Sequence, residues 1–294
     1  MKYFKISIVL TIILSIVIFS CDKIDSPYII PEPPPPPDCP TPDFPDISDY
    51  ERVVLLEEFT GHTCSNCPEG ALLAHDLKEQ YEEKLILISI HAGSYAIPKP
   101  DDPGFEIDLR TETGNLLLEE FDISGFPSGM INRTEVYNKW GLPIFVWENV
   151  LDSMMKAQPV IGMQMITEYD DSERKLCIHI KSKYLKDLSN SLMLSVYITE
   201  DSIKGAQTND NPDIGPSVLY PYWHMHVLRG SYETPWGFSV PGSPYKKDAT
   251  HITTYKYILD ENWKAKNCHV VAFIYDADSK VILQAVEAKV IGEE

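Results

Sequence analysis

Hydrophobic and polar positions follow two different patterns along this chain, and the change falls near residue 157. Before it, short apolar runs, which predict buried strands, alternate with segments in which apolar residues recur about every 3.6 positions, which predict helices. The expected strands cover residues 52–59, 85–91 and 129–132, and the expected helices cover residues 68–83, 109–120 and 145–156. Strands that alternate with helices are typical of an α/β unit, which we assign to residues 50–157.

After Pro159, apolar residues recur at every second position, which is the period of a half-buried strand. Seven segments with this pattern are expected to be strands: residues 160–167, 175–183, 192–199, 224–230, 251–259, 269–275 and 281–290. Many short strands without a helical pattern between them predict an all-β antiparallel sandwich of the immunoglobulin-like (Ig-like) kind. We therefore expect an all-β domain at residues 158–294, behind the α/β domain.

A separate apolar run lies at the N-terminus. Lys2 and Lys5 precede the apolar residues 6–19, and a serine and Cys21 follow them. A positive end, an apolar stretch and a small residue at the cleavage point are the parts of a secretion signal, so residues 1–20 are expected to be removed. The end of this segment resembles a lipobox, in which Cys21 is the residue that receives the lipid. An uncleaved anchor, or ordinary cleavage that leaves Cys21 as a free thiol, is the alternative.

Residues 21–49 are rich in proline, with ten prolines between Pro27 and Pro45. Proline fixes φ and lacks the backbone N–H, so such a segment can neither join a sheet nor continue a helix. Polyproline II is the expected conformation. We interpret the segment as a stiff tether between a lipid anchor and a folded body, and a disordered leader is the alternative.

The negative charge of the chain argues against some classes of binding partner. The sequence holds 44 acidic and 25 basic residues, with a formal net charge of −19. A strongly acidic body is not expected to bind nucleic acid or anionic lipid head groups. No later apolar run is long enough to cross a bilayer, so membrane lipid is expected to be a partner only through the N-terminal anchor.

The chain has six cysteines, and an exported protein can form disulfides. Cys64 and Cys67 form a CxxC motif. Cys177 and Cys268 both lie in expected strands and could form a bridge, whereas Cys39 lies between prolines, where we expect it to be exposed and able to pair between molecules. The sequence leaves these pairings open.

The CxxC motif follows a buried strand and opens a helix, which is a redox arrangement. Unpaired N–H groups at the start of a helix stabilise a thiolate, so Cys64 is the expected nucleophile and Cys67, one turn later, is the expected resolving cysteine. Half of a zinc site and a static disulfide are the alternatives, but no second cysteine or histidine pair completes a zinc site. We therefore expect no metal and no cofactor. His62 could lower the pKa of the Cys64 thiol if it is protonated, or it could be a solvated loop residue.

The residues around this motif resemble those of thioredoxin. Glu58 lies six positions before Cys64, where thioredoxins have a buried acid, so the resemblance implies that Glu58 handles the proton of Cys67. The segment Ile-Ser-Gly-Phe-Pro at residues 123–127 resembles the cis-proline loop, which implies that Pro127 lies against the active-site sulfurs and shapes substrate binding. The residue before the first cysteine and the two residues between the cysteines differ from thioredoxin, so the redox potential and the choice of partner do not carry over.

A wider resemblance is to the 28-kilodalton outer-membrane protein family. It rests on the segments around the CxxC and on residues 125–133, 226–229, 270–275 and 281–285. Members are lipoproteins of anaerobic Gram-negative bacteria with a thioredoxin-like half and a β half, which implies an outer-membrane location, facing the periplasm or the cell surface. Adhesin or receptor roles have been suggested for this family.

Two functions from different classes follow. In the first, the protein is a lipid-anchored thiol–disulfide oxidoreductase that acts on the thiols or disulfides of exported proteins, with Cys64, Cys67, Glu58 and Pro127 as its site. In the second, it is a surface adhesin or receptor for a host or surface ligand, and the CxxC is a structural disulfide.

Overall fold

The computed structural model describes residues 38–292. The predicted secretion signal, the predicted lipid site Cys21 and the first part of the predicted tether lie outside these residues. No helix in the described range is both long and apolar enough to cross a membrane.

Most of the regular structure is β-sheet. The described residues contain three α-helices, which are α2 (Cys67–Tyr81), α3 (Glu112–Glu120) and α4 (Trp147–Met155). The largest sheet is mixed and has eight strands, in the order β13-β12-β6-β9-β2-β1-β3, with β10 paired to β6. These strands are β1 (Val54–Thr60), β2 (Leu85–His91), β3 (Ser128–Ile131), β6 (Leu192–Glu200), β9 (Val227–Ser231), β10 (Phe238–Ser239), β12 (Cys268–Asp276) and β13 (Ile282–Lys289).

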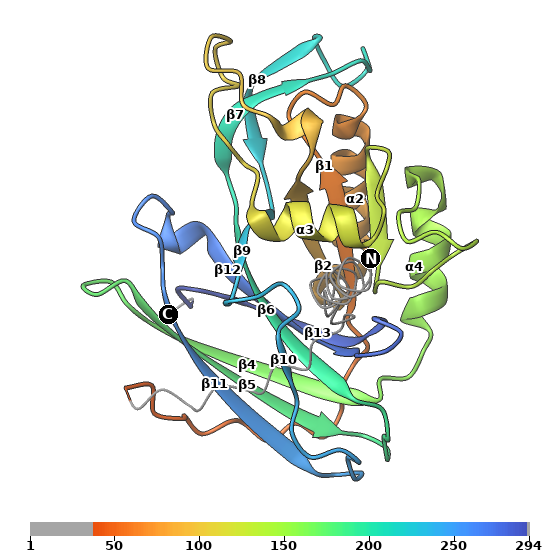
Figure 1. Cartoon of the computed structure of the whole chain (residues 1–294), viewed down its shortest axis with the longest axis vertical. Coiled ribbons are helices and arrows are strands. Elements are labelled where there is room, and N and C mark those ends of the chain that lie inside the picture. Colours follow the sequence, from red (N-terminus) through yellow and green to blue (C-terminus); the bar gives the residue numbers. More distant parts are fainter. Residues whose placement is uncertain (1–37, 293–294) are drawn as a thin grey trace, which may run out of the picture.

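Two smaller antiparallel sheets complete the fold (Figure 1). A three-stranded sheet has the order β11-β5-β4 and consists of β4 (Ile161–Asp170), β5 (Lys175–Tyr184) and β11 (Thr250–Ile258). Its inner side chains share one hydrophobic core with those of β6 and β12. The third sheet is the hairpin of β7 (Ile203–Thr208) and β8 (Val218–His224), which lies at the opposite end of the molecule.

The two halves expected from the sequence share the largest sheet. β9 pairs in parallel with β2 at Val227 and Ser89, and it pairs antiparallel with β6. The backbone N–H of Ser89 also donates to the carbonyl of His226 over 2.8 Å. The sheet therefore continues across the expected boundary at residue 157.

The periodic pattern predicted the helices well. The helices expected at residues 68–83, 109–120 and 145–156 correspond to α2, α3 and α4. Local chemistry sets their starts, because Pro68 occupies the first turn of α2 and the Thr111 side chain accepts a hydrogen bond from the Gly114 backbone N–H at the start of α3; both are favourable N-terminal arrangements.

The hairpin β7–β8 was missed, and the single strand expected at residues 224–230 was wrong. β8 ends at His224 and β9 begins at Val227, because His226 between them has a φ of 54° and breaks the extended chain. The hairpin has no clear alternation of apolar and polar residues because the side chains of β8 are mostly exposed or half-buried.

The expectation that Cys39 is exposed was wrong, and the possible bridge between Cys177 and Cys268 does not form. Cys39 is buried, with 3% of its surface exposed, and it forms a disulfide with Cys177, whereas Cys268 is a buried free thiol. The period of a strand explains this. Leu176 and Ile178 point into the core that contains Cys268, so Cys177 between them points to the opposite face of its sheet.

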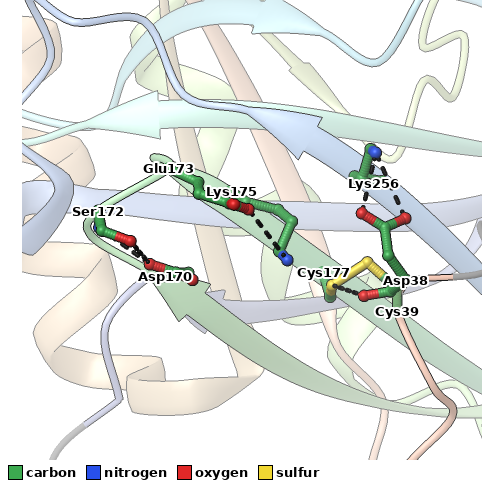
Figure 2. A network of polar contacts seen from close by, with 8 residues as sticks. All are labelled: Asp38, Cys39, Asp170, Ser172, Glu173, Lys175, Cys177 and Lys256. Atoms are coloured by element: carbon green, nitrogen blue, oxygen red, sulfur yellow. Dashed lines mark hydrogen bonds and ion pairs between the residues drawn. A yellow bond between two sulfur atoms is a disulfide. The ribbon is translucent and has the colours of Figure 1, made fainter.

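The segment around Cys39 covers that outer face (Figure 2). Asp38 forms an ion pair with Lys256 of β11, with Oδ2 and Nζ 3.0 Å apart. Thr41 contacts Thr254 of the same strand, and the backbone carbonyl of Pro45 accepts a hydrogen bond from Gln164 of β4. The last part of the expected tether is thus fixed to the three-stranded sheet.

Candidate functional site

Strand β1 carries the site because its side chains alternate between two cores. Val54 and Leu56 pack against α2 and α4 on one face, and Leu55 and Phe59 pack against α3 and the C-terminal strands on the other. Glu58 shares its face with Leu56, so its carboxyl points toward α2. It is buried, with 3% of its surface exposed.

The two cysteines of the CxxC form a disulfide at the start of α2. Cys67 is the first residue of the helix and Pro68 follows it, and the Cα atoms of Cys64 and Cys67 are 5.4 Å apart. Both cysteines are buried, with 3% and 1% of their surfaces exposed. The sequence placed this pair correctly, after a buried strand and at a helix N-terminus.

Glu58 is an acid that stays protonated near neutral pH. Burial raises its pKa to about 8, and the neighbouring side chain of Ser89 on β2 opposes this rise. Atom Oε1 of Glu58 has no hydrogen-bond partner among the described residues. A protonated carboxyl can donate a proton, and an ionised one can accept it, so a pKa near 8 suits either step close to neutral pH.

Pro127 lies against the same helix turn as Glu58. The bond between Phe126 and Pro127 is cis, in agreement with the expected cis-proline loop. Gly70 marks where the parts meet, since a Cβ atom on Gly70 would lie 2.8 Å from Cβ of Pro127 and 2.9 Å from Oε1 of Glu58. The fold therefore brings Glu58, Pro127 and the first turn of α2 together.

Gly70 is a residue of the site that the motifs of the sequence did not indicate. A glycine inside a helix costs about 1 kcal/mol relative to alanine, so its presence three positions after Cys67 is a signal that the position needs space. The structure supplies the reason, because the helix approaches both the cis-proline loop and the buried acid here.

Replacing Gly70 with alanine is expected to destabilise the protein by about 1–3 kcal/mol through overpacking, although alanine favours the helix. Urea unfolding measures the change. The matched control is Gly125→Ala, because no atom lies within 4 Å of a Cβ atom at Gly125. An equal or higher stability of the Gly70→Ala variant would show that this close approach is not required.

His62 does not act as a positive charge beside Cys64. It is buried, with 2% of its surface exposed, so the alternative of a solvated loop residue is wrong. Its Nε2 atom lies 3.0 Å from the carbonyl oxygen of Ile97, and its ring packs against Phe105. Burial lowers the pKa of His62, so a neutral ring is expected near pH 7.

The hairpin β7–β8 covers the CxxC loop from the side, at the end of the molecule where β1 ends and α2 begins (Figure 1). Nε2 of Gln207 donates to the carbonyl of Cys64 over 2.9 Å and to that of Gly61 over 3.3 Å. The backbone N–H of Thr208 donates to the carbonyl of His62, and that of Asp210 to the carbonyl of Ser65. The C-terminal half thus holds the CxxC loop, which the sequence did not predict because it did not predict the hairpin.

A cavity of about 340 Å³ lies between α2, β2 and β8, and Cys67 and Glu58 are part of its wall. Its polar wall includes Ser89, His91 and His224, and its apolar wall includes Leu72, Leu87 and Trp223. Within the described range, no group of three or more His, Cys, Asp or Glu side chains is arranged to hold a metal ion.

Comparisons with known proteins agree with this fold. The structure of HBP35 of Porphyromonas gingivalis is 19% identical over 83% of this chain and 76% of that chain, with a TM-score of 0.61. A protein of Agrobacterium tumefaciens is 12% identical over 84% of this chain and 98% of that chain, with a TM-score of 0.50. At these identities the likeness concerns the fold alone.

The remaining comparisons include a family model. A domain of the outer membrane lipoprotein Omp28 from Porphyromonas gingivalis is 22% identical over 46% of this chain and 92% of that domain, with a TM-score of 0.31. No curated protein matches the chain. The family model described as outer membrane protein Omp28 matches residues 115–294. Since this match spans more than half of the chain, the protein belongs to the outer membrane protein Omp28 family.

Proposed function

We propose that this protein is an outer-membrane lipoprotein that exchanges thiols and disulfides with exported proteins. The observation that carries the proposal is the meeting of three parts at the first turn of α2: the disulfide of Cys64 and Cys67, the buried acid Glu58 and the cis-proline Pro127. A disulfide that only stabilised the fold would not need a buried acid with a pKa near neutrality beside it.

The arrangement of the N-terminal half supports a thioredoxin-like unit at residues 50–157. β1 and β2 pair in parallel and β3 pairs antiparallel with β1. Helices α2 and α4 cover one face of these strands, and α3 covers the other. In this proposal residues 158–294 form an Ig-like β domain that supports the site and contributes the hairpin β7–β8.

The proposed chemistry is two exchange steps. A thiolate of the partner attacks Sγ of Cys64, a bond forms between these two sulfurs, and the bond between Cys64 and Cys67 breaks. Cys67 leaves as a thiolate and takes the proton of Glu58. A second thiolate of the partner then attacks the partner's own sulfur in the mixed disulfide, so that the partner is oxidised and Cys64 leaves as a thiolate. The reverse sequence reduces a partner.

The anchor is part of the proposal. Lipid on Cys21 would hold the protein at the outer membrane, and the disulfide between Cys39 and Cys177 fixes the later part of the predicted tether to the folded body. Mass spectrometry of the mature N-terminus tests this. An unmodified first residue other than Cys21 would contradict the lipid anchor.

A binding role is the second candidate, and one observation favours it. Both sulfurs of the CxxC are almost completely buried, and the hairpin β7–β8 is hydrogen-bonded to the CxxC loop. A buried disulfide of this kind can be structural. The hairpin would then display exposed side chains such as Tyr220 and Trp223 to a surface ligand.

The redox behaviour of the pair decides between the two candidates. The full-length protein is equilibrated with glutathione buffers, and the Cys67→Ala variant is incubated with exported proteins of the same cell. Exchange predicts a potential above about −300 mV and mixed disulfides through Cys64, which the Cys64→Ala/Cys67→Ala variant does not form. A lower potential with no trapped partner would contradict the exchange function and support a structural disulfide.

Glu58→Gln is expected to slow reduction of the disulfide by dithiothreitol at pH 7 by about tenfold or more, because it removes a general acid. The dependence of the reduction rate on pH shows whether Glu58 acts as an acid. Since the pKa of Glu58 is raised to about 8, the wild-type rate per dithiothreitol thiolate is expected to be constant below pH 8 and to fall above it as Glu58 ionises. The Glu58→Gln variant is expected to lack this fall, and Glu83→Gln, an exposed glutamate just after α2, is the matched control. Identical profiles for the wild type and Glu58→Gln would exclude Glu58 as the acid.

A further inference from the structure

The cavity beside Cys67 is built from both halves of the chain. Its wall includes Glu58 on β1, Ser89 and His91 on β2, and His224 at the end of β8. The register of the parallel pair β1–β2 places Glu58 beside Ser89 and Thr60 beside His91, and alternate residues of a strand share a face. Glu58, Ser89 and His91 therefore lie in a row that faces α2.

Three buried polar groups in this cavity have unusual surroundings. Glu58, His91 and His224 have 3%, 3% and 4% of their surfaces exposed. Oε1 of Glu58 and both ring nitrogens of His91 have no hydrogen-bond partner among the described residues. The rings of His91 and His224 meet edge to face with their centroids 5.1 Å apart.

Buried polar atoms are almost always hydrogen-bonded, to protein or to ordered water. A cavity with polar walls that is larger than several water molecules is a place where water supplies such bonds. The volume of about 340 Å³ meets this condition, and residues at its rim include His75, Trp223 and Met225, of which the last two are half exposed. The row of polar groups thus runs from the buried acid beside Cys67 toward the solvent.

We propose that this cavity is the proton passage of the exchange site, and that His91 and His224, joined by water, carry protons between Glu58 and solvent. This inference rests on the proposed thiol–disulfide exchange. The wall of the passage includes residues of α2 and β8 but neither Gly70 nor Pro127.

The proton balance of the step is simple. When a partner thiolate attacks Cys64, the bond between Cys64 and Cys67 breaks, and Cys67 receives the proton of Glu58. Glu58 is then an anion in a buried site, which is unfavourable. A neutral His91 donates a proton to it from one ring nitrogen and accepts one at the other from water or His224, so that solvent restores the acid without a net change in His91.

The charges around His91 are consistent with a neutral ring. Burial lowers the pKa of His91, and the neighbouring His224, His62 and Arg229 lower it further, whereas the Ser89 backbone opposes this. Burial also lowers the pKa of His224, to about 4. The other titratable groups that face the cavity are Glu58 on β1, Cys67 and His75 on α2, and Tyr222 and His226 at either side of His224. His91 and His224 act through Glu58, and we therefore describe them as positioning residues.

Chemical rescue tests the proposal. In the full chain, reduction of the disulfide by dithiothreitol is followed from pH 5 to pH 9 by acid quenching, alkylation and mass spectrometry. His91→Ala is expected to lower the rate at pH 7 by about tenfold. His224→Phe is also expected to lower this rate. Added imidazole is expected to restore the rate of His91→Ala, whereas pyrazole, which has nearly the same size but is a much weaker base, is not.

Several outcomes would overturn the proposal. A His91→Ala rate equal to that of the wild type, or equal rescue by imidazole and pyrazole, would show that His91 only fills space. His91→Gln, which keeps size and hydrogen bonding but cannot exchange protons as imidazole does, replaces His91→Ala if the latter does not fold, and it must also be slow. The matched control is His251→Ala on β11, far from the cavity, which is expected to react like the wild type.

The same experiment separates this proposal from the function on which it rests. A wild-type disulfide that dithiothreitol does not reduce would contradict the exchange function itself. A wild type that reacts quickly, with an equally fast His91→Ala variant, would contradict only the proton passage.

Discussion

Replacing Arg133 with alanine is expected to lower the free energy of unfolding by about 3–5 kcal/mol, because it leaves a buried carboxylate without its partner. Arg133 and Glu57 are both completely buried, and Nε and Nη2 of Arg133 donate to the two carboxylate oxygens of Glu57 over 2.8 and 2.7 Å. Nη2 also donates to the hydroxyl of Tyr197 over 3.0 Å. Burial alone would lower the pKa of Arg133, but Glu57 and Tyr197 raise it, so Arg133 stays charged.

This pair joins distant parts of the chain. Glu57 lies on β1 and Arg133 follows β3, whereas Tyr197 lies on β6. The guanidinium carbon of Arg133 is 5.2 Å from the ring centre of Phe121 and 4.8 Å from that of Phe273. Loss of Arg133 therefore affects contacts between the helix-covered strands and the C-terminal strands of the same sheet.

Urea unfolding measures this effect, with a double variant as control. Arg133→Met with Glu57→Met removes both charges and keeps side-chain volume, so it is expected to be more stable than Arg133→Ala by several kcal/mol. Arg133→Lys keeps the charge but cannot form the bidentate hydrogen bonds. Its stability is expected to lie between those of the wild type and Arg133→Ala. A loss below about 1 kcal/mol for Arg133→Ala would show that the ion pair contributes no more than an exposed one.

Replacing Cys39 with alanine is expected to lower the free energy of unfolding by about 2–5 kcal/mol, because the disulfide with Cys177 closes a long loop in the unfolded chain. The two cysteines are 138 residues apart in the sequence. Without the bond, the segment at residues 38–49 is held to β4 and β11 mainly by surface contacts, such as the ion pair of Asp38 and Lys256.

Three variants identify the bond as the cause. Cys39→Ala, Cys177→Ala and the double variant all break the same disulfide, so they are expected to have nearly the same stability, and their N-terminal segment is expected to be cleaved faster in limited proteolysis. The double variant Cys64→Ala/Cys67→Ala is the comparison, because its cysteines are only 3 residues apart and the loop they close is short. Additive losses for Cys39→Ala and Cys177→Ala would contradict the assigned bond.

The local chemistry of the site could be read from the sequence. The apolar run of β1, the CxxC motif and Pro68 together place a cysteine pair at a helix start, and Glu58 as the acid is what the resemblance to thioredoxin implies. These features depend on neighbours within one strand and one helix, where hydrophobic period and backbone propensity are sufficient. The cis bond at Pro127 followed from the resemblance to thioredoxin. The division into two domains at residue 157 and the lipid on Cys21 stay predictions.

The features that surround the site depend on the tertiary structure. Gln207 meets the backbone of Cys64 from 143 residues away, and His224 meets His91 across the cavity. Cys39 pairs with Cys177 rather than remaining exposed, because a loop packs against the outer face of β5. A period of two or 3.6 shows which side of an element is buried but does not show which distant element buries it.

The sequence by itself therefore determined a helix that begins at a cysteine pair and the strand before it, and the resemblance to thioredoxin pointed to Glu58 on that strand. Only the tertiary structure decided that the acid would be buried with a raised pKa, that Gly70 would be the point of contact with Pro127, and that histidines from both halves would share a cavity with Cys67. The reason is that a pKa and a cavity depend on the desolvation and packing produced by all surrounding elements, whereas a strand or a helix start depends mainly on its own residues.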